Sequence, residues 1–358
     1  MLARGLVCAQ AYVEECSTLL DEGNTVPCIA RYRKEQHGSM DDTTLRKLED
    51  RLTYLRSLDQ RRQEVKKAVD GQGKLTPELS DGIDAAATLA EVEDLYRPYK
   101  QKRRTRATAA REKGLEPLAQ RLYAQERTCP RPEDAAADFI IPENGVETVA
   151  DALQGANDIV AELLSDDAAI RKTLRGLLMR QGHLRSLAAK EEDSVYRLYY
   201  DFDQSVAKLA DHQILAINRG EKEGFLSVKI EGEEEKLLQR MEKRLIRRSS
   251  DTADILREVI ADSYKRLIAP SLEREIRNDL TEQADEAAIG VFRENLRQLL
   301  LQPPISGKVV LALDPAYRTG CKIAVIDATG KPLETTVVYP TPPQNKTAEA
   351  EKKLLGLI

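Results

Sequence analysis

Apolar residues recur at helical spacing through most of the first 300 residues. In residues 41–71, leucines and valines return every three or four positions from Leu45 to Val69, between a capping aspartate and a closing glycine. Similar segments continue to about residue 181, with a break near Ser165. This pattern predicts a string of helices.

The longest uninterrupted apolar face belongs to residues 271–301. It runs from Leu272 to Leu299 and contains no proline. As one helix, the segment would be about 46 Å long at 1.5 Å per residue, and a helix of that length is typical of a spine between subdomains. The prolines that begin at Pro303 mark the clearest domain boundary in the chain.

Two regions depart from the helical pattern. Short runs with branched residues near 212–230 predict a small β-hairpin inside the helical region of residues 1–302. Residues 308–358 are predicted to be mixed α/β instead of helical, with three strand-like runs followed by the start of a helix. We expect the runs at 308–314 and 321–327 to pair as an antiparallel hairpin, which 332–339 extends.

Composition narrows the class of protein. The chain has 358 residues, of which 41% are hydrophobic and 32% charged, so it is expected to be soluble and globular. No apolar run reaches the roughly 20 residues that span a bilayer, and no secretory signal is visible. We therefore expect a cytoplasmic protein without a membrane partner. The five cysteines and three histidines show no ligand spacing, so neither a metal nor a cofactor is expected.

Positive charge gathers at one place in an acidic chain. The formal net charge is -5, yet residues 97–113 hold eight basic residues and a single acidic one. We name six of these cations the basic run: Arg97, Lys100, Lys102, Arg103, Arg104 and Arg106. Clustered cations suit phosphate contacts, and Tyr96 and Tyr99 could stack on unpaired bases. The alternative is a loop that acidic neighbours at 91–94 neutralise, or one that organises packing between helices.

A second set of cations lies on one predicted helical face at Arg240, Lys243, Arg244, Arg247 and Arg248. Glu234 and Glu235 lie one to two helical turns away. The favoured interpretation of this set is pairing with those carboxylates.

One carboxylate is a candidate for metal chemistry. Asp314 ends a hydrophobic strand, the position at which ribonuclease H-like folds place their first metal ligand. Two-metal phosphodiester cleavage needs several converging carboxylates, and no second one is visible. Asp327 lies in a turn-like "IDATG" segment and is expected to stabilise that turn. Nuclease activity through Asp314 therefore remains an alternative to a non-enzymatic role.

Several stretches resemble the Tex family of bacterial transcription accessory proteins. Among them are "LLDEGNTVPCIARYRKEQHGSMDD", "LYRPYKQKRRTRATAAREKGLEPLA", "ILAINRGEKEGFL" and "LALDPAYRTGCKIAVIDATGK". The resemblance implies a mainly α fold: a multi-helix array with a helix-turn-helix-like element and a spine helix, followed by a partial YqgF-type ribonuclease H-like α/β domain at 308–358. On this resemblance, the family's helix-hairpin-helix and OB-fold modules are expected to lie outside these 358 residues.

The resemblance also implies a function. It favours a non-catalytic accessory factor that binds RNA or DNA, with RNA polymerase or ribosome components as further partners. Asp314 would then be a vestigial ribonuclease H-like position, which agrees with the absence of a second converging acid. The family usually has glycine where Ala316 follows "LDP" here. A protein-interaction scaffold without direct nucleic-acid contact is the other alternative.

Overall fold

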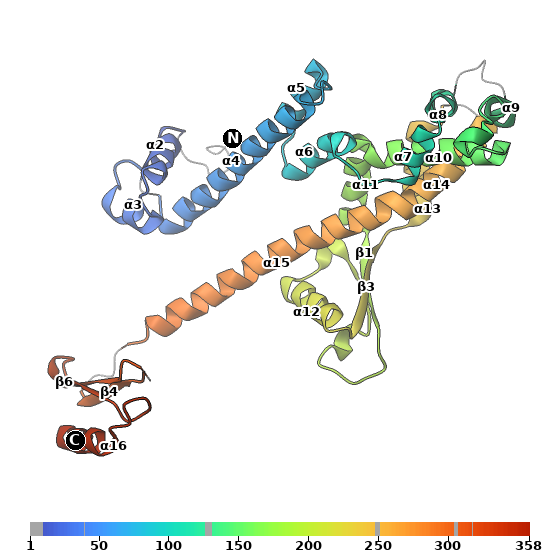
Figure 1. Cartoon of the computed structure of the whole chain (residues 1–358). Coiled ribbons are helices and arrows are strands. Elements are labelled where there is room, and N and C mark those ends of the chain that lie inside the picture. The colour runs from blue at the N-terminus through green and yellow to red at the C-terminus, as the bar shows by residue number, and fades with distance from the viewer. Residues whose placement is uncertain (1–9, 39, 126–130, 248–250, 304–306, 317) are drawn as a thin grey trace. The chain divides into compact units, whose positions relative to one another are not determined.

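The computed structural model describes residues 10–38, 40–125, 131–247, 251–303, 307–316 and 318–358, and Figure 1 shows the whole chain. The chain divides into two compact units, Met1–Asp285 and Glu286–Ile358. The first unit is mainly helical, and the second consists of the end of a long helix, a small sheet and one further helix.

The first unit is built from a succession of helices and short helical turns. In chain order they are α2 (Gln10–Asp21), α3 (Val26–Tyr32), α4 (Asp42–Asp70), α5 (Pro77–Ala85), α6 (Leu89–Tyr96), η1 (Arg97–Tyr99), α7 (Arg106–Glu112), α8 (Glu116–Ala124), α9 (Pro132–Ala137), η2 (Pro142–Asn144), α10 (Val149–Asp166), α11 (Ala168–Gln181), η3 (Arg197–Tyr199), η4 (Val206–Lys208), α12 (Asp211–Lys222), α13 (Glu234–Leu245), α14 (Asp251–Ser263), the π-helical turn η5 (Tyr264–Ile268) and the start of α15 (Ala269–Leu300). The helical string predicted from apolar spacing is confirmed.

Side chains fix where the main helices begin. The Asp41 carboxylate accepts a hydrogen bond from the Thr44 backbone N at 2.7 Å, and this cap lowers the pKa of Asp41. At the start of α10, Thr148 and Asp151 form a reciprocal capping box. The chain then turns at Asp167, close to the break predicted near Ser165.

Buried apolar residues form three clusters in the first unit. One joins α2 and α3 to the first half of α4, and a second joins the rest of α4 to α5 and α6. The largest cluster surrounds α10, which α7, α8, α9 and α14 contact (Figure 1). Helix α10 is therefore the centre of the larger helical core.

The first unit also contains a three-stranded antiparallel sheet, which corrects the predicted hairpin near 212–230. Its strands are β1 (His183–Ala188), β2 (Asp201–Ser205) and β3 (Leu226–Glu231), in the order β2-β1-β3. Residues 211–222 are helix α12 instead of a strand, because Ile214 and Ile217 are buried together one helical turn apart. Only the second half of the predicted hairpin is a strand, and its partner is β1.

The long helix is confirmed. Helix α15 runs from Ala269 to Leu300 without interruption and ends before Pro303. Leu272, Ile276 and Leu280 bury one face of its first half in the core of the first unit. Among the described helices, none is long and apolar enough to cross a membrane.

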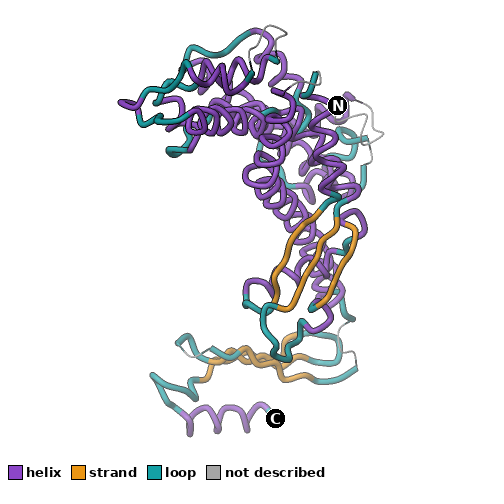
Figure 2. Tube along the Cα trace, turned by 90° about the vertical axis from the view of Figure 1, so that its right-hand side faces the viewer, coloured by secondary structure: helices purple, strands orange, loops and turns teal. Residues whose placement is uncertain are grey.

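The second unit contains a sheet of three strands. They are β4 (Val310–Asp314), β5 (Cys321–Ile326) and β6 (Pro332–Val338), antiparallel in the order β4-β5-β6, and α16 (Thr347–Leu357) follows. Ile323 and Val338 pack with Ala350 of α16, which lies along one face of the sheet (Figure 2). The predicted hairpin, its extension by the third strand and the final helix are all confirmed.

Candidate nucleic-acid interface

The basic run follows α6 and leads through η1 and a short loop into α7. Thr105 fixes the end of this loop. Its hydroxyl accepts from the Thr108 backbone N at 3.0 Å and donates to Glu162 Oε1 of α10 at 3.0 Å. The Thr105 hydroxyl alone therefore attaches the end of the loop to α10, independently of the cations in the loop.

Arg97 points into the protein. Its guanidinium approaches two carboxylates, with Nε 3.4 Å from Asp166 Oδ1 and Nη1 3.9 Å from Glu275 Oε1. Burial lowers the pKa of the Arg97 guanidinium, and the neighbouring Arg171 cation lowers it further. Arg97 is half-buried, and its guanidinium connects the loop to carboxylates of α10 and α15.

Lys102 is also held by α10. Its ammonium pairs with Asp166 and lies 3.5 Å from Glu162 Oε1, and both carboxylates are nearly buried. Burial raises the pKa of Glu162, but Arg111, which donates to Oε2 at 2.7 Å, and Lys102 outweigh it and lower that pKa overall. Lys102 therefore helps to neutralise an acidic end of α10.

Lys100 and Arg104 have partners closer along the chain. Lys100 pairs with Glu93 and lies over the Tyr96 ring, 5.5 Å from its centroid. Arg104 pairs with Glu112 at 2.8 Å, and both of these side chains are exposed. The predicted alternative of neutralisation by residues 91–94 is therefore confirmed for Lys100.

Arg103 and Arg106 differ from the other four cations. Both are exposed, and neither forms an ion pair with any residue that the structure describes. Arg106 begins α7 directly after the Thr105 cap, and Arg103 lies between two cations that have partners. The structure thus separates the basic run into four paired cations and two free ones.

Tyr96 and Tyr99, which the sequence suggested as stacking surfaces, are partly covered by packing within the protein. Both rings are half-buried against the apolar cluster of α4, α5 and α6. Arg61 lies over the Tyr96 ring, with its guanidinium carbon 5.6 Å from the ring centroid. These aromatic rings contribute to packing beside the basic run.

A buried ion network behind the basic run escaped the sequence analysis. Arg171 is fully buried and donates to Asp94 Oδ1 at 2.8 Å, to Ser271 Oγ at 3.2 Å and to Glu275. Arg175 bonds both Asp94 oxygens and Glu275 Oε2, at 2.8–2.9 Å. Burial alone would lower the pKa of Arg175, but these carboxylates outweigh it and raise that pKa. The network joins α6, α11 and α15.

The cations of α13 are less neutralised than predicted. Arg240 and Lys243 of α13, and Arg247 two residues beyond its end at Leu245, are exposed and have no ion pair among the described residues. The predicted helical face therefore ends before Arg247, and Arg248 lies outside the described residues. Glu234, the predicted partner, pairs with Lys265 at 3.1 Å instead. The sequence analysis underestimated the number of free cations on this face. Lys265 follows α14 and takes Glu234 as its partner, and local spacing could not predict that contact between distant residues.

Two further contacts show that the basic run and α13 approach the same turn of the chain. Lys102 pairs with Asp166, the last residue of α10, and Arg244 lies 4.0 Å from the carboxylate of the next residue, Asp167. Consecutive Cα atoms are about 3.8 Å apart. The two sets of cations therefore meet at neighbouring residues of one turn.

In the second unit, Asp314 stands at the exposed end of β4. It faces Lys322 of β5 in register and lines a shallow hollow with Lys322 and Thr336. The structure shows no hydrogen bond to its carboxylate from a described residue. No group of three or more potential metal-ligating side chains occurs among the described residues.

Asp327 stabilises a turn, as predicted. Its Oδ1 accepts from the Thr329 hydroxyl and from the backbone N atoms of Thr329 and Lys331, at 2.7–2.9 Å. These bonds lower the pKa of Asp327.

Comparison with known proteins covers nearly the whole chain. Family models match at residues 1–70 (Tex-like protein N-terminal domain), 128–292 (Tex central region-like) and 308–358 (Tex protein YqgF-like domain). Uncharacterized protein YdcI of Bacillus subtilis is 48% identical over 365 residues, covering 100% of this chain and 50% of that protein.

Two other relatives have more informative names. Transcriptional accessory protein Tex of Neisseria gonorrhoeae is 41% identical over 348 residues, covering 95% of this chain and 45% of the relative. S1 RNA-binding domain-containing protein 1 of Homo sapiens is 33% identical over 340 residues, covering 90% of this chain and 34% of the relative. The chain spans about half the length of the first two relatives.

Fold and matches together define a mainly helical protein whose core surrounds α10 and which continues into a partial YqgF-like α/β domain. The chain belongs to the Tex family.

Proposed function

We propose that this chain is part of a non-catalytic transcription accessory factor that binds the phosphate backbone of nucleic acid through Arg103 and Arg106. The observation that carries the proposal is the division of the basic run. Four of its cations are occupied by carboxylates, while these two are exposed and have no ion pair among the described residues.

The paired cations support this role by positioning the free ones. Arg97 and Lys102 attach the loop to α10, and Thr105 attaches its end. A loop that is already ordered loses less conformational entropy when it binds, so its free cations are used more effectively. Phosphate contacts of this kind give affinity without reading base sequence.

The names of two relatives support the proposed role in nucleic-acid binding. One is named a transcriptional accessory protein, and another is named for an S1 RNA-binding domain. We extend the first role, and contact with RNA or DNA, to this chain as a proposal. Association with RNA polymerase or ribosome components, and a cytoplasmic location, remain predictions that follow from the family resemblance.

The non-catalytic part of the proposal rests on Asp314. Two-metal hydrolysis needs carboxylates that converge on both ions. The side chains that line the hollow beside Asp314 include Lys322 and threonines but no second acid. A nuclease assay with Mg²⁺ or Mn²⁺ tests this point, because cleavage that disappears in Asp314→Asn would contradict it.

The binding proposal is tested by replacing both free arginines with alanine and measuring single-stranded oligonucleotide binding across a range of salt. Each phosphate contact contributes about 0.7 to the slope of log K against log salt, so two contacts contribute about 1.4. We expect the slope to fall by about that amount with no change in the unfolding midpoint.

The control variant removes the same charge elsewhere. Arg293 and Lys308 are exposed and have no ion pair among the described residues. Their double alanine variant should retain the original slope. Equal losses in both variants would indicate a general charge effect and would contradict the assignment to Arg103 and Arg106.

A further inference from the structure

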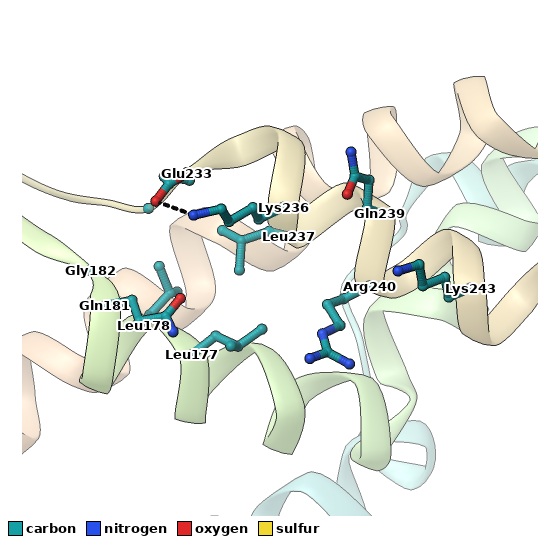
Figure 3. A pocket seen from close by; sticks show the side chains of 11 residues that line it. Leu177, Leu178, Gln181, Gly182, Glu233, Lys236, Leu237, Gln239, Arg240 and Lys243 are labelled. Carbon is teal, nitrogen blue, oxygen red and sulfur yellow. Dashed lines mark hydrogen bonds and ion pairs between the residues drawn. The ribbon is translucent and has the colours of Figure 1, made fainter.

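A pocket of about 380 Å³ lies between the C-terminal half of α11 and helix α13. Its lining does not include Arg103 or Arg106. We call it the α11–α13 pocket. Figure 3 shows Leu237 and Arg240 extending from α13 toward α11 and Leu177 extending from α11 toward α13.

The floor of the α11–α13 pocket is apolar. Leu178 and Leu237 are buried, with 3% and 4% of their surface exposed, and Leu177 beside them is half-buried. A Cβ atom placed on Gly232 would lie only 2.8 Å from Leu178 and 2.9 Å from Leu237, so the floor is already closely packed on that side. The half-buried side chain of Leu177 leaves apolar surface toward the open side of the pocket, where an aliphatic side chain can lie.

The rim of the pocket is positive. Lys236, Arg240 and Lys243 occupy one face of α13 because they are four and three residues apart. Glu233 is the only carboxylate in the lining, and it already pairs with Lys236 at 2.7 Å. Arg240 and Lys243 have no ion pair with any described residue, so one end of the rim is neutral and the other carries two free cations.

This combination points to a particular ligand chemistry. Nucleic acid would supply phosphates for the cations, but its bases bind best to aromatic surfaces, and the lining contains no aromatic side chain. An apolar floor beside free cations is instead complementary to a peptide that carries an aliphatic residue next to carboxylates.

We propose that the α11–α13 pocket docks an acidic segment of a partner protein, with a leucine-like side chain on the floor and carboxylates against Arg240 and Lys243. The rim from Lys236 to Lys243 is about 10 Å long at 1.5 Å per residue. An extended peptide covers that distance with about three residues. The recognised segment is therefore short, and its specificity comes from one anchor and its acidic neighbours.

The test uses labelled peptides of about ten Glu and Asp residues that contain two leucines at different spacings, with matched peptides in which serine replaces leucine. Fluorescence anisotropy with the whole chain measures binding. At least one leucine peptide should bind at least about tenfold more tightly than its serine counterpart, because only leucine fills the floor.

Variants assign the binding to the pocket. Arg240→Glu and Leu177→Asp should each weaken the leucine peptide at least about tenfold, because they add a negative charge at the rim or the floor. Arg293→Glu is the matched control on exposed surface and should leave binding unchanged. Arg240→Gln, a milder change, is measured beside Arg240→Glu and should give a smaller loss in the same direction.

The proposal is independent of the phosphate contacts proposed above, so the double alanine variant of Arg103 and Arg106 should bind the peptides normally. Absence of peptide binding up to about 1 mM would overturn the proposal. So would binding that is insensitive to both pocket variants. Displacement of the peptide by oligothymidylate, together with loss of oligothymidylate binding in Arg240→Glu, would assign the pocket to nucleic acid and also refute it.

Discussion

The basic run and the exposed cations in and just after α13 differ in how many of their cations have carboxylate partners. In the basic run, four of six cations have carboxylate partners. Arg240 and Lys243 on α13, and Arg247 just after it, have none among the described residues. The region with the denser positive charge in the sequence therefore offers fewer free cations than its density suggests.

The difference arises from the position of the partners along the chain. Lys102 reaches Asp166, 64 residues away, and Arg97 reaches both Asp166 and Glu275. Such partners come together only when α10 and α15 pack beside the loop. Charge clustering in a sequence thus identifies where cations are, but tertiary packing determines which of them remain available to a ligand.

The largest expected effect comes from the buried network behind the basic run. Arg171→Met should lower the free energy of unfolding by about 3–5 kcal/mol, because it leaves buried carboxylates with one cation fewer. Urea denaturation followed by circular dichroism measures the change. A loss below about 1 kcal/mol would show that the network contributes to specificity more than to stability.

A smaller effect is expected where the loop meets α10. Lys102→Ala should cost about 1–2 kcal/mol of unfolding free energy, between the values for buried and exposed pairs, since its two carboxylate partners are nearly buried. A loss no larger than that of an exposed pair would place Lys102 with the free cations, contrary to the structure.

The same contact predicts a dependence on pH. The folded pKa of Glu162 lies below its ordinary value of 4.5, so this carboxylate stabilises the fold above that pH. Its contribution is lost as the pH falls through the lower folded value. The stability difference between the protein and Glu162→Gln should therefore be constant near neutral pH and narrow below about pH 4.5. A difference independent of pH down to acid unfolding would show that charge is not the cause.

The smallest effect on stability is expected at the exposed pair. Arg104→Ala removes an ion pair with Glu112 in which both side chains are mostly exposed, so the free energy of unfolding should change by no more than about 0.5 kcal/mol. The same urea experiment measures this change. A loss comparable to that of Lys102→Ala would show that the burial of the carboxylate partner does not determine how much a cation stabilises the fold.

Local pattern was sufficient for much of the fold. The long helix α15 was predicted because Leu272 to Leu299 maintain one apolar face, and the strands of the second unit because branched runs alternate with turn residues. Asp327 was predicted as a turn residue from its immediate neighbours alone. Each of these features depends on residues that are close together in the sequence.

What failed depended on distant residues. The Ile214 segment was predicted as a strand because its branched residues favour sheets, but packing buried it as helix α12, and the true partner of β3 was β1. The roles of Asp94 and Arg171 were missed because they are 77 residues apart. For the same reason, the six cations of the basic run looked equivalent.

The most direct test compares two pairs of cations from the basic run in one experiment. The Arg103 and Arg106 double alanine variant and a Lys100 and Lys102 double alanine variant each remove two charges from the same loop. Single-stranded oligonucleotide binding against salt and urea unfolding are measured for both.

The first variant should lower the slope of log K against log salt by about 1.4 and leave the unfolding midpoint unchanged. The second variant should lower the midpoint while the slope stays nearly constant. The opposite assignment, with loss of slope on removing Lys100 and Lys102 and loss of stability on removing Arg103 and Arg106, would contradict the division between structural and ligand-binding cations.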